Sequence, residues 1–146
     1  MENLFSGEYK HNLDSKGRII MPVKFREAIG DSFVITRGLD KNLYVYSHEE
    51  WDKFCEKLSA LPLSSKEARN FSLLFLSGAT DCETDKQGRF LIPPTLREYA
   101  SLEKEVTVTG SGNKLAIWSS EKLIERIESI DTDQMADDLY EKGIII

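Results

Sequence analysis

The sequence of 146 residues has little of what membrane and secreted proteins require. No apolar run approaches the ~20 residues of a membrane-spanning helix. Residues 1–5 contain an acid, no basic start and no long apolar segment, so we expect no signal peptide. The only two cysteines, Cys55 and Cys82, form no Cys-x-x-Cys pair. They are typical of reduced thiols, which predicts a cytoplasmic protein without a membrane partner.

The residues of most catalytic and metal sites are also scarce. The two histidines, His11 and His48, have no cysteine or acid at metal-ligand spacing. The sequence lacks a Gly-x-Gly-x-x-Gly fingerprint, a Walker loop and a Gly-x-Ser-x-Gly elbow. Cys82 lies between two acids, which disfavour a thiolate, and Cys55 lies on the apolar side of an expected helix, where we predict a core position. We therefore expect no enzyme, and no cofactor, metal or small-molecule substrate.

Basic residues are outnumbered, and the net charge of −6 by itself argues against a nucleic-acid partner. The excess of acids is concentrated near the C-terminus. Residues 121–142 contain eight acids and three bases, a net charge of −5, which leaves −1 for the rest of the chain. Residues 14–26, in contrast, contain one acid and four bases. This is a charge asymmetry of the kind that marks interaction segments, although an ordinary solvated surface also carries many charges.

The chain contains an internal repeat, in which residues 14–27 align with residues 85–98. At a chance identity of roughly 6% per position, about one match is expected in such a window. The aligned segments instead share six identities, which are Asp14/Asp85, Gly17/Gly88, Arg18/Arg89, Pro22/Pro93, Arg26/Arg97 and Glu27/Glu98. The similarity continues from residues 33–36 onto 106–109 and from 43–47 onto 115–119. The sequence is therefore a duplicated unit.

Each copy predicts the same short elements. A strand-like run ends at a turn in which Gly17 or Gly88 supplies a positive φ, and a short apolar strand follows. Pro22 or Pro93 then opens a short helix. The residues expected to face the core from these helices are Phe25, Ala28 and Ile29 in the first copy, and Leu96, Tyr99 and Ala100 in the second. Two β-rich runs come next, joined at residues 38–42 and 110–114 by hairpin connections.

Both copies end in a helix. Ser47 and Ser119 are the expected N-caps, and an apolar stripe follows each of them. The stripe of the second helix contains Leu123, Ile124, Ile127 and Ile130. A capping box of Ser64 and Glu67 predicts a linker helix with Ala68, Phe71, Leu74 and Phe75 on its apolar side. The last three residues, all isoleucine, are either a packed or a frayed end of the chain.

A single copy is too small to bury enough apolar surface to be stable alone. We therefore expect the copies to pack on or through each other as a pseudo-dimer with an approximate two-fold axis. The predicted organisation is a first repeat with its trailing helix at residues 5–60, a linker helix at 61–76, a second repeat with its trailing helix at 77–130, and an acidic tail at 131–146.

The repeated Asp-x-x-x-Arg turn is the candidate site. One interpretation is an ion pair that fixes the turn to the sheet. In the other, Asp14 and Asp85 orient Arg18 and Arg89, whose outer sides bind phosphate or a guanine edge. Further candidates in these loops are Lys16 and Lys86, which would contact phosphate, and Gln87, which would read an adenine edge. Gly17 and Gly88 support the turns. For Arg26 and Arg97 we expect a structural role before a binding one.

The doubled Asp-x-x-Gly-Arg pattern, followed by three apolar residues and Pro, resembles the MraZ family, as do residues 7–14 and 36–40. The resemblance covers residues 5–142. It implies a β-rich α+β fold of two tandem SpoVT-AbrB-type swapped-hairpin β-barrel repeats with flanking helices. It also implies a ring-shaped homo-oligomer that binds short direct repeats in double-stranded DNA. The motif maps onto Asp14/Arg18 and Asp85/Arg89, with Lys16 in one copy where the other has Gln87.

The same resemblance implies a transcriptional regulator of the bacterial division and cell-wall gene cluster, located in the cytoplasm and on the nucleoid. The acidic C-terminal region must then point away from the DNA-binding face. The alternative is a protein-interaction or antitoxin-like module, in which the loops around Arg18 and Arg89 bind an acidic partner protein.

Overall fold

The computed structural model describes residues 4–146, so the prediction about a signal peptide rests partly on residues outside the described part. The strands are β1 (Glu8–Asn12), β2 (Arg18–Ile20), β3 (Ser32–Arg37), β4 (Leu43–Ser47), β5 (Thr80–Glu83), β6 (Arg89–Leu91), β7 (Glu105–Gly110) and β8 (Leu115–Ser119). The helices are α1 (Val23–Ile29), α2 (His48–Ser59), α3 (Lys66–Phe71), the π-helical segment η1 (Ser72–Leu76), α4 (Pro94–Tyr99), α5 (Ser120–Glu128) and α6 (Thr132–Glu141). None of these helices is both long and apolar enough to cross a bilayer.

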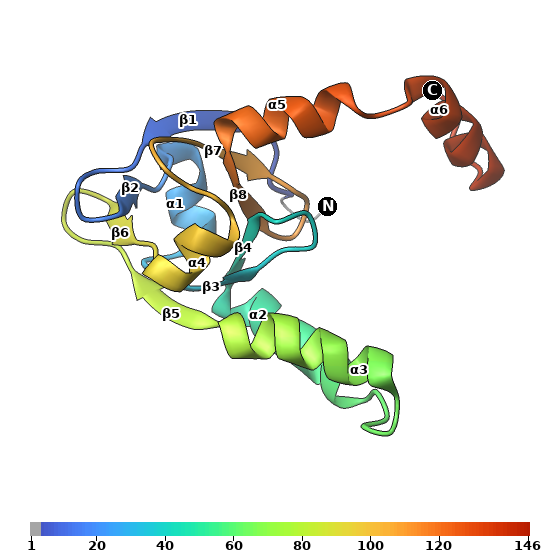
Figure 1. Ribbon diagram of the computed structural model, residues 1–146, viewed down its shortest axis with the longest axis horizontal. Helices are drawn as coiled ribbons and strands as arrows, with labels where there is room; N and C mark the ends of the chain where they lie inside the picture. The colour runs from blue at the N-terminus through green and yellow to red at the C-terminus, as the bar shows by residue number, and fades with distance from the viewer. Residues whose placement is uncertain (1–3) are drawn as a thin grey trace.

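The two copies exchange strands. An antiparallel sheet has the order β1-β7-β8-β4-β3-β5, and β2 pairs with β6 in a separate ribbon. The first strand of each copy thus pairs with a strand of the other copy, β1 with β7 and β5 with β3. Equivalent residues of the two copies also face each other. Ile19 lies opposite Phe90 in the β2–β6 ribbon, and Tyr44 lies opposite Ala116 where β4 pairs with β8. The expected pseudo-two-fold arrangement and the β-rich α+β class with helices are confirmed (Figure 1).

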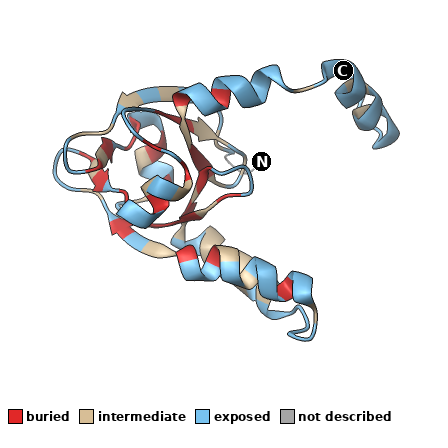
Figure 2. Ribbon diagram, in the orientation of Figure 1, coloured by how far each residue is buried: buried red, intermediate tan, exposed pale blue. Residues whose placement is uncertain are grey.

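One core serves both copies. The fully buried rings of Phe33 and Phe90, one from each copy, meet edge to face with their centroids 5.1 Å apart. Inward side chains of the hairpin strands, such as Val45 and Ile117, surround this pair. Figure 2 shows the buried residues gathered in the barrel, whereas the projecting helices are mostly exposed. Neither copy could form this core alone, because each supplies only part of its apolar surface.

The short helices α1 and α4 close the barrel. Leu96 and Ala100 are buried as predicted, as are Phe25 and Ile29. The prediction for Ala28 was wrong, since this residue is exposed. A helix of seven residues presents only a narrow face to the barrel, and the pair at spacing i, i+4 fills it.

The cap of the linker helix is displaced by one residue. Ser47 and Ser119 accept hydrogen bonds from backbone N–H groups three residues on, as predicted. Ser65 caps α3 by accepting from the N–H of Ala68, so the prediction of Ser64 was wrong. The reason is a turn before the helix, in which the N–H of Ser65 donates to the carbonyl of Pro62.

The trailing helix α2 packs outside the barrel, on the linker helix. Its Phe54 stacks on Tyr46 with centroids 5.5 Å apart and meets Phe75 of η1 edge to face at 5.1 Å. Cys55 is therefore half-buried on this arm, and the prediction that it belongs to the core was wrong. The stripe predicted for the linker helix is only partly covered, since Phe75 is buried but Phe71 is 42% exposed.

The helices α5 and α6 form a second projecting arm (Figure 1). Of the apolar stripe on α5, Leu123 is buried, whereas Ile124 and Ile127 are about half exposed. The apolar stripe predicted for α5 is therefore largely uncovered, whereas α2 packs on the linker helix. Beyond α5 lies α6. The three final isoleucines are exposed, which favours a frayed end of the chain over a packed one.

Candidate nucleic-acid interface

The turn at residues 14–18 is organised by one carboxylate. Asp14 Oδ1 accepts hydrogen bonds from the backbone N–H groups of Lys16 and Arg18, both at 2.9 Å. Its second oxygen, Oδ2, accepts from Arg18 Nε at 2.7 Å. Gly17 adopts φ +81°, which lets the chain return to β2. Because Asp14 uses only Nε of the guanidinium, the terminal nitrogens of Arg18 are left to bind another group.

The turn at residues 85–89 repeats this geometry. Asp85 Oδ1 accepts from the N–H groups of Gln87 and Arg89 at 2.9 Å, and Oδ2 accepts from Arg89 Nε at 2.8 Å. Gly88 adopts φ +79°. One difference separates the copies: Arg89 Nη2 donates to Gln87 Oε1 at 3.2 Å, whereas Lys16 stands at the equivalent position of the first copy. Gln87 therefore also orients Arg89.

Both carboxyl groups are held in their charged form. The backbone N–H of Arg18 is the largest cause that lowers the pKa of Asp14 to about 2, and bonds from the Arg18 side chain and the Lys16 N–H act in the same direction. The N–H of Arg89 is likewise the main cause of a lowered pKa at Asp85. Both turns therefore keep an ionised carboxylate on the guanidinium at neutral pH.

The two arginines lie on one outward face. In the β2–β6 ribbon, Arg18 is opposite Leu91 and Ile20 is opposite Arg89. Opposite residues of an antiparallel pair point to the same side, and diagonal neighbours are typically ~7–8 Å apart. Ile20 and Leu91 are 38% and 50% exposed, so this side faces solvent, whereas the alternate residues Ile19 and Phe90 point into the core.

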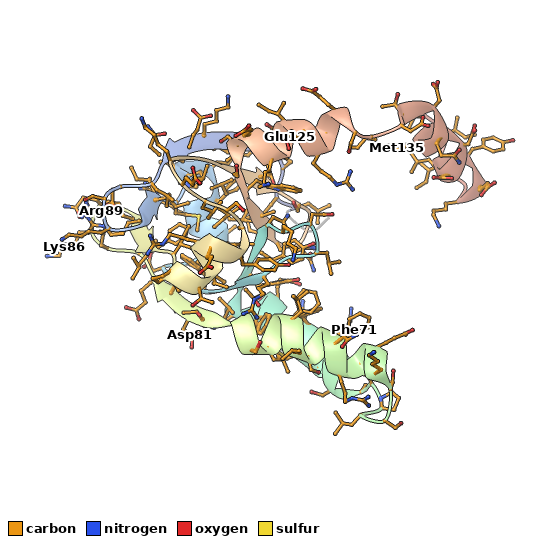
Figure 3. All side chains as sticks on the ribbon, in the orientation of Figure 1. Phe71, Asp81, Lys86, Arg89, Glu125 and Met135 are labelled. Carbon is orange, nitrogen blue, oxygen red and sulfur yellow. The ribbon has the colours of Figure 1, made fainter. Side chains whose placement is uncertain are left out.

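The guanidinium groups are partly covered by their own turns. The side chains of Arg18 and Arg89 are 27% and 32% exposed. The ion pair that fixes each turn is thus present, and an accessible side of each arginine is present with it. Lys16, Lys86 and Gln87 are all exposed around these arginines. Figure 3 shows Lys86 and Arg89 at the outer end of the barrel, at the opposite end of the molecule from Met135 of α6.

Two further arginines stand behind these turns. A Cβ added at Gly17 would lie 2.5 Å from Arg97 Cζ, and one added at Gly88 would lie 2.6 Å from Arg26 Cζ. Each turn thus rests on an arginine that follows the other copy's short strand. Arg26 Nε donates to the Met21 carbonyl at 2.8 Å, and Arg97 Nε makes the equivalent bond at 2.9 Å. The identity of these positions in the repeat was a signal, but the contact across copies cannot be seen in the sequence.

The charge of this end of the barrel is positive. The two turns and the arginines behind them contain six cations, which are Lys16, Arg18, Arg26, Lys86, Arg89 and Arg97. The carboxylates of Asp14 and Asp85 oppose them within the turns, and Glu27 and Glu98 directly follow Arg26 and Arg97, so the cations still exceed the acids by two. Although the chain as a whole is acidic, this surface is therefore basic. Its guanidinium groups present forked hydrogen-bond donors that suit phosphate oxygens or base edges.

Comparisons with known proteins agree with the repeat. The family model "MraZ protein, putative antitoxin-like" matches residues 4–74 and again residues 75–138. A "Transcriptional regulator MraZ" of Halothermothrix orenii is 59% identical over 82% of this chain and 83% of its own length. Proteins of the same name from Caldicellulosiruptor bescii and Natranaerobius thermophilus are 51% and 54% identical, over 94% and 82% of this chain and 98% and 83% of their own lengths. The chain belongs to the MraZ family.

Proposed function

We propose that this protein is a transcriptional regulator that binds double-stranded DNA in a sequence-specific manner through the turns at residues 14–18 and 85–89. The observation that carries the proposal is the pair of equivalent guanidinium groups, Arg18 and Arg89, each braced by a carboxylate and both on the outer face of the β2–β6 ribbon. The relatives named as transcriptional regulators support the same function.

The chemistry of the turns suits this role. A guanidinium oriented through Nε presents its terminal nitrogens as a fork, which matches a phosphate or the O6 and N7 atoms of guanine. Lys16 and Lys86 add attraction to the phosphate backbone, and Gln87 is able to read an adenine edge. Because the two turns are related by a pseudo-two-fold axis, they suit the two strands of a duplex.

The finer parts of the proposal concern assembly and target. We propose that copies of the chain form a ring, so that several pairs of turns contact short direct repeats at once and the effective concentration of each turn rises. The target is the promoter of the division and cell-wall gene cluster, and the site of action is the nucleoid. The acidic arm of α5 and α6 lies away from the turns, which limits its repulsion of the duplex (Figure 1).

The proposal is tested with Arg18→Ala and Arg89→Ala in a mobility-shift titration on the protein's own upstream DNA. A specific forked contact is worth about 1–3 kcal/mol, so each change should weaken binding about 5- to 150-fold. The matched control is Lys53→Ala, which removes an exposed cation that pairs with Glu49 at 3.4 Å on α2. It should leave affinity unchanged.

Folding and salt dependence separate the two roles of the arginines. If Arg18→Ala and Arg89→Ala unfold the chain, the ion pairs serve the turn and the proposal loses its support. If both variants stay folded with undiminished affinity, the proposal is wrong. Phosphate contacts also predict a steep loss of affinity with salt, with a slope that falls by about one for each contact removed.

A second candidate is a module that binds an acidic protein, because the same forks bind carboxylates in bidentate geometry. Competition distinguishes the candidates. A regulator captures fragments of its own upstream DNA from a mixed pool, and duplex DNA releases any acidic protein bound to the turns. A partner that stays bound in excess duplex favours the interaction module.

A further inference from the structure

Two aliphatic side chains lie on the outward face of the β2–β6 ribbon, at the end of the barrel away from both arms (Figure 1). Ile20 and Leu91 are 38% and 50% exposed there. They occupy equivalent positions of the repeat, each two residues after the arginine of its turn. The barrel core takes the alternate residues, Ile19 and Phe90, so it does not account for an aliphatic side chain at either outward position.

Arginine and aliphatic residues alternate on this face. Arg18 lies opposite Leu91, and Ile20 lies opposite Arg89. Opposite residues of an antiparallel pair have their Cβ atoms ~4.5–5.5 Å apart. Each end of the ribbon therefore presents one guanidinium and one aliphatic side chain next to each other, and the pseudo-two-fold axis relates the two ends.

Backbone hydrogen bonds fix both aliphatic residues. The N–H of Met21, the residue after the first of them, donates to the Gly88 carbonyl at 2.8 Å. The N–H of Ile92, the residue after the second, donates to the Gly17 carbonyl at 3.0 Å. A surface that is ordered before it binds loses little conformational entropy on binding. The ribbon is thus a preformed surface, in which the apolar groups keep a fixed distance from the guanidinium groups.

A DNA duplex offers one apolar partner to such a surface. In the major groove, thymine alone of the four bases presents a methyl group, whereas the other base edges present hydrogen-bond donors and acceptors. The groove is about 12 Å wide and admits a two-stranded β-ribbon. An aliphatic side chain cannot satisfy a polar base edge, so burial of Ile20 or Leu91 against such an edge would be unfavourable.

We propose that Ile20 and Leu91 select thymine by contact with its 5-methyl group in the major groove, beside guanines that Arg18 and Arg89 bind. The inference rests on the proposed function and deepens it, because it names the base that the aliphatic positions select. Side chains ~5 Å apart across the ribbon correspond to one or two base-pair steps of ~3.4 Å. Each selected thymine is therefore expected one or two steps from a contacted guanine. The pseudo-two-fold axis places the two thymines on opposite strands.

A different use of exposed aliphatic side chains is insertion between base pairs, as wedges that kink the duplex from the minor groove. A wedge has to project beyond its surroundings. Ile20 and Leu91 are at least half covered and belong to paired strands rather than to the tips of loops. Side chains in this position touch a surface and do not enter a base stack, which favours the contact with methyl groups.

The test removes single methyl groups from the DNA and leaves the protein unchanged, so it does not depend on the folding of any variant. In the shortest bound duplex of the protein's own upstream DNA, each thymine in turn is replaced by deoxyuridine, which lacks the methyl group and keeps the base pairing. Burial of one methyl group is worth about 4-fold in affinity. A selected thymine should show a loss of about that size, and other thymines should show none. A parallel scan with 7-deazaguanine, which lacks the N7 acceptor, locates the contacted guanines.

Protein variants assign each methyl group to its side chain. In Ile20→Ala the loss caused by deoxyuridine should disappear at one of the selected thymines, and in Leu91→Ala it should disappear at the other. The matched control is Leu63→Ala, at a 78% exposed site in the turn before α3, and it should keep both losses. Because each variant is compared on two duplexes that differ by one methyl group, a general change of affinity cancels.

Failure of this inference and failure of DNA binding can be told apart. If the unchanged protein does not bind its own upstream DNA, the proposed function is wrong and this inference is wrong with it. If the protein binds through Arg18 and Arg89 but no thymine responds to loss of its methyl group, the thymine contact alone is refuted. Losses that persist in both alanine variants would refute it as well, because the methyl groups would then contact other residues. Kinked DNA in a circular-permutation mobility assay, without a deoxyuridine effect, would instead assign Ile20 and Leu91 to wedges.

Discussion

Replacing Gly17 with alanine would test how the two copies brace each other's turns. The φ of +81° at Gly17 costs an L-residue about 1–2 kcal/mol. The new Cβ would also stand 2.5 Å from Arg97 Cζ, so the arginine must swing away. It would then lose the bond from its Nε to the Ile92 carbonyl, which is worth about 1.5–3 kcal/mol for a charged donor. The expected loss of unfolding free energy is about 2.5–5 kcal/mol.

Urea unfolding, followed by the fluorescence of the two tryptophans, measures this loss. The matched control is Gly112→Ala, because Gly112 has nearly the same φ, +80°, and no atom within 4 Å of the added Cβ. It should cost only about 1–2 kcal/mol. In an Arg97→Ala background, the cost of Gly17→Ala should fall to that same value. Equal costs of Gly17→Ala with and without Arg97 would refute the contact between the copies.

Three further predictions concern single residues. In an NMR titration, the Asp14 carboxyl should show a pKa near 2. Its contribution to the stability of the fold is therefore complete above about pH 4 and is lost as the pH falls towards 2. A midpoint at 3.8 or higher would contradict the bonds from Arg18. Phe33→Ala should cost about 3–5 kcal/mol and keep one calorimetric transition, because Phe33 packs on Phe90 of the other copy; two transitions would mean separate cores. Burial raises the pKa of Cys82 to about 11, so iodoacetamide at pH 8 should label it only in urea, and mass spectrometry showing label on the folded protein would refute this.

Local signals made much of the fold predictable. Gly17 and Gly88 mark the turns because few other residues adopt a positive φ, and both take one in the structure. Ser47 caps its helix because its hydroxyl oxygen accepts from a backbone N–H of the first helical turn, which has no partner within the helix. The repeat adds more, since two weak copies of one pattern support each other and suggest an approximate two-fold axis.

Contacts between distant residues were not predictable in the same way. The residues alone left open whether the copies pack on or through each other, and only the family resemblance implied the exchange of strands. Arg26 was expected to be structural, but no spacing rule links it to Gly88 of the other copy. Ile124 and Ile127 resemble core residues because periodicity reports an apolar face without reporting what covers it.

The exchange of strands has a consequence for synthesis on the ribosome. β1 has no antiparallel partner until β7 has been translated, and at ~5–20 residues per second that interval is on the order of 5–20 s. During this time the nascent first half displays open strand edges, which are a template for pairing with a strand of a neighbouring nascent chain. Heavily loaded messages should therefore yield intertwined dimers, in which β1 of each chain completes the sheet of the other.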